Sequence, residues 1–213
     1  KFVALVRRAA EPAAPGALRV LQINSVCGTG STGRIAAAMY RALRARRHGC
    51  KIAYGRGTAH GVPADDAVRV GRAPGVALHA AGARLFDRAG FGSGCATRRF
   101  IREIRRYRPH LIHLHNLRGY YLNVRILFRF LARARIPVVW TLHDCWAFTG
   151  HCCHFSALGC ARWRTGCRRC PQKYAYPKSV LLDRSKKNYA QKNALFKSMP
   201  DLTVVTPSEW LGS

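Results

Sequence analysis

The sequence lacks any apolar run near the roughly 18–20 residues that a helix needs to cross a bilayer. It also lacks a signal peptide, because the opening run Lys1–Val6 is too short for an apolar core and Arg7 follows that run instead of preceding it. No internal repeat is visible. From these absences we expect neither a membrane-spanning protein nor a secreted protein, but a cytoplasmic chain.

Acidic residues are scarce, since 9 Asp and Glu face 37 Lys and Arg and the formal net charge is +28. Such a charge attracts polyanions, which include nucleic acids, anionic lipids and nucleotide phosphates. Most of the cations are Arg on the outer faces of predicted helices, where Arg125, Arg129 and Arg133 recur at every fourth residue. This spacing favours a solvated basic surface, which an anionic membrane could contact, over a specific nucleic-acid interface.

Strand-like and helix-like segments alternate along the chain. Apolar, β-branched runs predict strands at 18–23, 50–54, 110–114, 137–142 and 202–206. Helices are predicted after Gly33 and at about 76–89, 96–107, 120–134 and 182–198. This alternation predicts an α/β fold, a Rossmann-like parallel sheet with helices on both faces. Residues 1–17 are expected to form an unpacked leader before one domain at 18–213, and 58–75 a loop.

The first predicted helix is amphipathic, and a glycine-rich loop joins it to the first strand. Its buried face is expected to contain Ile35, Met39 and Leu43. The small residues of the loop are Gly28, Gly30, Ser31 and Gly33. Glycines let a backbone approach a phosphate, and the free N–H groups of the helix start favour an anion. We therefore predict a phosphate or sugar-phosphate contact.

A dinucleotide site would need an acidic residue at the end of the second strand. The first acidic residue after the loop is Asp65, well beyond that point. Arg56 keeps an NADP-dependent oxidoreductase open as an alternative, because an arginine there suits a 2′-phosphate.

Polar residues follow two of the buried strands. His115 and Asn116 come after one strand, and His143 and Asp144 come after the next. Ligands of open α/β sheets bind beyond the carboxyl ends of the strands. His143 is suited to position a sugar by hydrogen bonds, and Asp144 to accept a proton. The alternative is that these residues cap strands, but two such pairs beside a glycine loop favour a site. We expect His143 and Asp144 to be catalytic, and His115 and Asn116 to bind the substrate or the donor.

Six of the nine cysteines fall within a Cys-rich insertion at 145–172. The predicted ligands of a structural zinc ion are Cys152, Cys160, Cys167 and Cys170, with His151 and His154 as substitutes. A cytosolic chain favours metal over disulfides, and oxidised pairs and free thiols stay open as alternatives. Four sulfur ligands leave no open position, so a catalytic zinc is not expected. A zinc-containing, basic nucleic-acid-binding module is a second alternative function.

Several motifs resemble bacterial family 4 glycosyltransferases of the group that builds capsule, exopolysaccharide and colanic-acid-like polymers. They are Ile112–Asn116, Gly119–Asn123, Val138–Cys152, Trp163–Gln172 and Val205–Trp210. The stretch 143–152, which reads His-Asp-Cys-Trp-Ala-Phe-Thr-Gly-His-Cys, is the most specific. The resemblance covers essentially 18–213 and implies the GT-B architecture, in which two Rossmann-like domains face each other across a cleft. This chain resembles the N-terminal half, which mainly holds the acceptor.

The resemblance also implies roles for single residues. Its glycine loop faces the donor diphosphate and the acceptor, and His143 matches a histidine that contacts the transferred sugar. The family retains anomeric configuration with help from the donor phosphate, so it implies neither a protein nucleophile nor a catalytic metal. A similar cysteine pattern in family members supports a structural site at the predicted zinc ligands.

The expected function is therefore a retaining, sugar-nucleotide-dependent glycosyltransferase. Its substrates are a nucleotide-sugar donor and a lipid-linked or oligosaccharide acceptor, met in the cytoplasm or on the inner face of the membrane. The chain begins without Met and stops after a strand-like run, so we expect a piece that lacks the C-terminal donor domain and is inactive alone.

Overall fold

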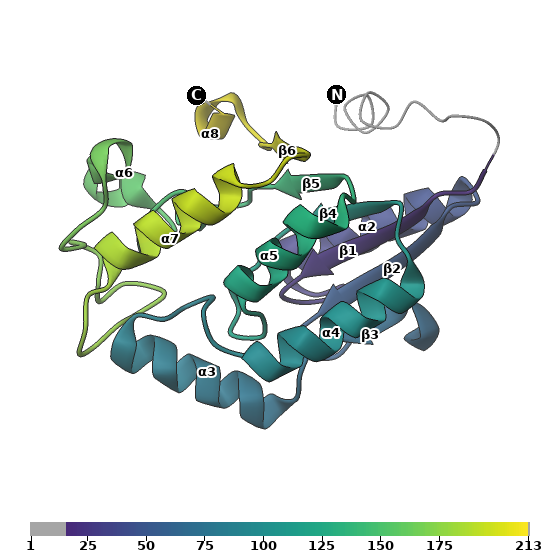
Figure 1. The fold of residues 1–213 in the computed structure, drawn as a ribbon, viewed down its shortest axis with the longest axis horizontal. Coiled ribbons are helices and arrows are strands. Elements are labelled where there is room, and N and C mark those ends of the chain that lie inside the picture. The colour runs from purple at the N-terminus through teal and green to yellow at the C-terminus, as the bar shows by residue number, and fades with distance from the viewer. Residues whose placement is uncertain (1–15, 213) are drawn as a thin grey trace.

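The computed structural model describes residues 16–212, so all but the last two positions of the predicted leader, 1–17, lie outside the described residues. Six strands form one sheet in the order β3-β2-β1-β4-β5-β6 (Figure 1). The strands are β1 (Arg19–Asn24), β2 (Gly49–Tyr54), β3 (Ala67–Arg69), β4 (Leu111–Leu114), β5 (Val138–Thr141) and β6 (Leu202–Val205). All neighbours pair in parallel, which confirms the predicted Rossmann-like α/β fold.

Helices cover both faces of this sheet (Figure 1). The longer ones are α2 (Gly30–Ala45), α3 (Ala73–Phe86), α4 (Gly94–Tyr107), α5 (Val124–Ala134) and α7 (Ser185–Lys197). The short ones are α6 (Arg162–Thr165), α8 (Glu209–Gly212) and the 3-10 turns η1 (Ala64–Asp66), η2 (Cys145–Ala147) and η3 (Phe155–Leu158). Among residues 16–212, no helix is both long and apolar enough to cross a membrane.

The sheet separates two apolar cores. Leu21 and Ile112 belong to the core shared with α4, α5 and α7, whereas Val20 and Ile52 pack with α2 on the other face. Strands covered on both faces need apolar side chains on both, which explains their nearly continuous apolar runs.

The structure corrects the predicted buried face of α2. The buried residues are Gly33, Ala36, Ala37 and Tyr40, whereas Ile35, Met39 and Leu43 are exposed or half-buried. Small side chains let the helix lie close to β1. The side-chain nitrogen of Gln22 consequently reaches the Ala36 carbonyl oxygen at 3.0 Å.

The predicted loop at 58–75 is wrong in part, because it contains η1 and β3. In β3, Ala67 lies opposite Ile52 of β2. A three-residue strand is too short to show a hydrophobic period in the sequence.

The strand order reverses at the centre of the sheet, between β1 and β4. Ile23 of β1 lies opposite Leu114 of β4, which lies opposite Trp140 of β5, so the carboxyl ends of these strands are neighbours. Ligands of open α/β sheets bind beyond this edge, at the point of reversal. The glycine loop and both polar pairs follow these three strands, so the fold brings them to one edge.

Candidate functional site

The glycine loop between β1 and α2 leaves no room for a side chain at Gly28. Its φ is +74°, and a Cβ there would lie 1.9 Å from the His60 carbonyl oxygen. The Gly28 N–H donates to the Gly33 carbonyl oxygen at 3.1 Å, which closes the turn. Gly30 and Ser31 begin α2 and are exposed. The positive end of the helix dipole is therefore open to solvent, as an anion contact requires.

A buried polar layer lies between the sheet and α2, at the carboxyl edge of β1, β4 and β5. His113 Nε2 lies 2.8 Å from Thr141 Oγ1, and His115 Nδ1 lies 3.1 Å from His143 Nε2. His115 Nε2 lies 3.1 Å from Gln22 Oε1. The rings stack, with centroids 4.2 Å apart for His113 and His115 and 5.4 Å apart for His115 and His143. His143 is half-buried and forms the accessible end of the layer.

Hydrogen bonds in this layer determine which nitrogen of His143 carries the proton. The Gln22 amide nitrogen donates to the Ala36 carbonyl, so the amide oxygen faces His115 and accepts its Nε2–H. Neutral His115 then presents an unprotonated Nδ1, which accepts the Nε2–H of His143. The other ring nitrogen of His143, Nδ1, then carries no proton, and its lone pair can accept a hydrogen bond from a hydroxyl group.

Burial keeps these imidazoles neutral. Burial, together with repulsion from His143, lowers the pKa of His113 to about 4. Burial and repulsion from both neighbouring imidazoles hold the pKa of His115 well below its ordinary value. Burial also lowers the pKa of His143, with Asp144 acting in the opposite direction. At neutral pH the layer therefore works as a set of neutral donors and acceptors.

Asp144 is engaged through both carboxylate oxygens. Oδ2 accepts from Arg118 Nε at 2.8 Å, and Oδ1 accepts from the Trp146 N–H at 2.9 Å. Burial opposes the charge of Arg118, but pairing with Asp144 raises its pKa, and its guanidinium lies 4.5 Å from the centre of the Tyr176 ring. A carboxylate with these partners holds the loop after β5 in place.

His143 and Asp144 line a small hollow. Other residues of its wall are Asn116, Leu117, Leu142 and Trp146. Its volume is about 10 Å³, which is enough for about one water molecule. This hollow is too small for a sugar.

The predicted zinc site is not supported. Its four cysteines line one small cavity, and a hydrogen bond from Cys170 lowers the pKa of Cys152. However, no group of three or more His, Cys, Asp and Glu side chains within 16–212 could hold a metal. His151 binds Asp87 instead, with 2.6 Å between Nδ1 and Oδ1, and His154 is exposed. All nine cysteines are free thiols, so the structure contains none of the disulfides that were the alternative to a metal site.

Comparison with known proteins identifies the family. The profile of Glycosyltransferase Family 4 matches residues 32–208, well over half of the chain. The chain belongs to Glycosyltransferase Family 4. It is also similar to WcaC of Escherichia coli (strain K12), assigned as a colanic acid biosynthesis glycosyl transferase, with 37% identity over 133 residues. That similarity covers 59% of this chain and 32% of WcaC, so the chain spans about a third of this relative.

The family 4 match includes both polar pairs and Gly33, whereas Gly28, Gly30 and Ser31 precede it. His115 was expected to contact a substrate, but it is 2% exposed and binds His143 instead. Sequence reasoning missed its partner Gln22, whose only signal was a polar residue within an apolar strand run. It also missed Arg118, because nothing in the sequence pairs this residue with Asp144, 26 positions away.

Proposed function

We propose that residues 18–213 form the acceptor-side domain of a retaining, sugar-nucleotide-dependent glycosyltransferase in cell-surface polysaccharide synthesis. The observation that carries the proposal is the convergence of the glycine loop and the His143 layer at the reversal point of the sheet. Membership of family 4 supports the transferase, and the similarity to WcaC supports polysaccharide synthesis.

The side chains divide the work by their geometry. The lone pair of His143 Nδ1 accepts a hydrogen bond from a hydroxyl of the transferred sugar and orients it. The open N-terminus of α2, at Gly30 and Ser31, meets the donor diphosphate and stabilises the charge that develops as it leaves. Asp144 and Arg118 hold the loop that carries His143. We assign no protein nucleophile, because the donor phosphate assists the reaction in the proposed mechanism.

A second domain completes the site in this proposal. The hollow beside His143 is too small for a sugar, and the chain spans about a third of WcaC. A donor-binding domain facing the carboxyl edge would close the cleft. The excess of cations, 37 against 9 acidic residues, supports a peripheral location on the inner face of an anionic membrane.

His143→Ala tests the site. We expect turnover of the intact protein to fall roughly a hundredfold or more, as it does when a hydrogen bond that orients or stabilises the reacting group is removed. His48→Ala is the matched control, because His48 is half-buried like His143 but lies just before β2 and therefore at the opposite edge of the sheet. Release of nucleoside diphosphate from a panel of nucleotide sugars is the assay. Equal activity of both variants would remove His143 from the site.

A further inference from the structure

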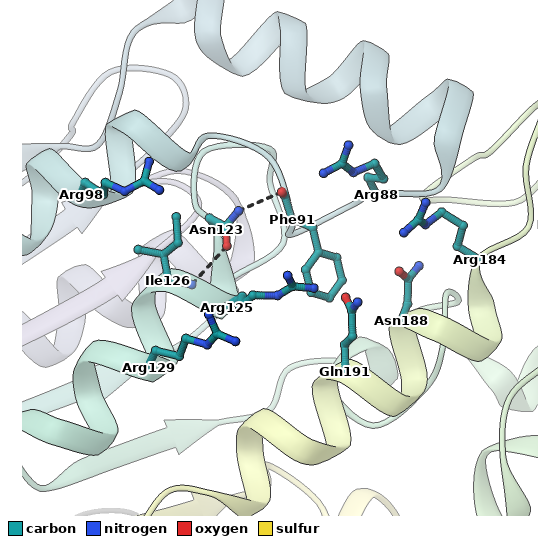
Figure 2. A pocket seen from close by; sticks show the side chains of 10 residues that line it. All are labelled: Arg88, Phe91, Arg98, Asn123, Arg125, Ile126, Arg129, Arg184, Asn188 and Gln191. Atoms are coloured by element: carbon teal, nitrogen blue, oxygen red, sulfur yellow. Dashed lines mark hydrogen bonds between the residues drawn. The ribbon is translucent and has the colours of Figure 1, made fainter.

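Five arginines line a cavity of about 290 Å³ among the N-terminal turns of α4, α5 and α7 (Figure 2). They are Arg88, Arg98, Arg125, Arg129 and Arg184. They come from the loop after α3, from α4, from α5 and from the residue before α7. Figure 2 shows Arg125 reaching from α5 toward Phe91 and toward Gln191 of α7, with Arg88 and Arg184 on the far side. This volume is at the lower end of the roughly 300–1,000 Å³ of small-molecule sites.

The positive charge of this arginine pocket is not compensated within the described chain. Among residues 16–212, none of the five arginines forms an ion pair with a carboxylate. The first turns of α4, α5 and α7 contain no acidic residue. Arg184 Nε is buried and has no hydrogen-bond partner. Arg88, Arg98 and Arg129 are exposed, whereas Arg125 and Arg184 are half-buried. An anion in the pocket would reduce the repulsion among these like charges and would give the buried Arg184 donor a partner.

The two carboxylates in the adjoining segments are already occupied. Asp87 Oδ1 binds His151, and its Oδ2 accepts from the Arg184 backbone N–H at 2.8 Å. Asp183 Oδ1 accepts from the Ser185 N–H at 2.9 Å, and its Oδ2 accepts from the Cys170 N–H at 2.6 Å. These contacts position the walls of the pocket and leave the guanidinium groups to a ligand.

An apolar groove continues from the arginine pocket, and the two share Ile126 and Arg129. α4 and α5 run side by side (Figure 1). The groove between them measures about 760 Å³. Its apolar lining includes Ile101, Ile104, Phe130 and Ile136. Its polar lining consists of His110 and five arginines, namely Arg19, Arg105, Arg108, Arg129 and Arg133.

We propose that the arginine pocket and the groove together bind the lipid diphosphate of a lipid-linked acceptor. The diphosphate lies in the pocket, because guanidinium groups bind phosphate oxygens in pairs of hydrogen bonds. The hydrocarbon chain lies along the groove, where it buries apolar surface. The proposal rests on the proposed function, and it selects a lipid-linked acceptor over a free oligosaccharide.

The direction of α4 and α5 places the acceptor sugar at the carboxyl edge of the sheet. α5 follows β4 and α4 precedes it, so both helices begin at the carboxyl edge of the sheet, where His143 lies. The pocket is formed by their first turns and the groove by their later turns. Gly90, next to Phe91 of the pocket, packs so tightly on Trp146 that a Cβ would lie 2.7 Å from its ring. Trp146 also lines the hollow beside His143, so a sugar on the diphosphate starts close to the catalytic edge.

Three probes separate the two parts of the site. Geranylgeranyl diphosphate carries head and chain, inorganic pyrophosphate carries the head alone, and geranylgeraniol carries the chain alone. We expect calorimetric titration of the intact protein, without donor sugar, to show saturable binding of the first probe at least about tenfold tighter than of either other probe.

Paired variants test the arginines. Arg125→Gln with Arg184→Gln is expected to weaken both diphosphate probes by roughly tenfold or more and to leave geranylgeraniol unchanged. Arg99→Gln with Arg102→Gln is the control, because it removes the same charge from exposed positions of α4 that line neither cavity. Phe130→Ser is expected to weaken only the two probes that carry a chain.

Two outcomes would overturn the proposal. Equal losses in the pocket and control variants would show that net charge alone attracts the anion. Binding to phosphatidylglycerol vesicles that depends on Arg125 and Arg184, without saturable binding of geranylgeranyl diphosphate, would make this face a membrane-docking surface. Failure of the proposed function can be told apart from failure of this proposal. If the protein is not a glycosyltransferase, no nucleotide sugar is turned over, but the titrations with the three probes still give the expected result. His143→Ala is likewise expected to bind geranylgeranyl diphosphate normally.

Discussion

Because the stacked imidazoles are buried and neutral, we expect the protein to lose stability as the pH falls from about 6.5 to about 4. Burial lowers the pKa of His113 from 6.5 to about 4 in the folded protein. Above pH 6.5, His113 is neutral in both the folded and the unfolded protein. Between pH 6.5 and about 4, His113 binds a proton only in the unfolded protein. The free energy of unfolding therefore falls by about 1.4 kcal/mol per pH unit on acidification, which reaches about 3 kcal/mol at pH 4. The lowered pKa of His115 acts in the same direction.

Comparison of wild type with His113→Gln measures this contribution together with the repulsion that His113 exerts on His115. Glutamine keeps an amide that can reach Thr141 but does not titrate. Urea unfolding at pH values from 7 to 4 gives the free energy of unfolding of each protein. We expect the advantage of the wild type to shrink by about 3 kcal/mol across this range. A difference that stays constant from pH 7 to 4 would refute the assignment of a buried, neutral His113.

Two further predictions concern the site. Gln22→Leu removes the acceptor of the His115 proton, so the nitrogen NMR shifts of His143 are expected to show a mixture of its two tautomers. We also expect kcat to fall by a larger factor than KM changes. An unaltered His143 spectrum would exclude the orientation of His143 by Gln22 through His115. Gly28→Ala is expected to destabilise the protein more than Gly30→Ala in urea unfolding. Both positions have positive φ, which costs about 1–2 kcal/mol for alanine, but only at Gly28 does the new Cβ meet backbone. Equal losses would show that the loop adjusts.

The central elements of the fold follow directly from the sequence. Apolar runs such as the one at 110–114 mark buried parallel strands, because both faces of each strand are covered. The alternation with helices then implies that the ends of β1, β4 and β5 meet at one edge. His143 could be located in this way, since its position just after a buried strand determines where it lies.

Other features depend on three-dimensional packing that no local pattern reports. Ile35 is 42% exposed, because α2 approaches the sheet through its small residues instead of its large ones. Arg125 and Arg129 have the spacing of a solvated helical face, yet they line a cavity with arginines from three other segments. The predicted zinc ligands gather around one cavity, but spacing in the chain does not determine the angles between thiols that a metal needs.

The polar layer has a consequence for how the sheet aligns during folding. Neighbouring apolar strands can slip by two residues and still direct the same faces inward. Such a slip of β4 would bring His113 toward the position of His115 and would break the bonds to both Gln22 and Thr141. Those buried groups would then lack partners, at a cost of about 1–3 kcal/mol each. The same contacts that orient His143 therefore also select the native register, across strands whose pairing partners lie 91 positions apart in the chain.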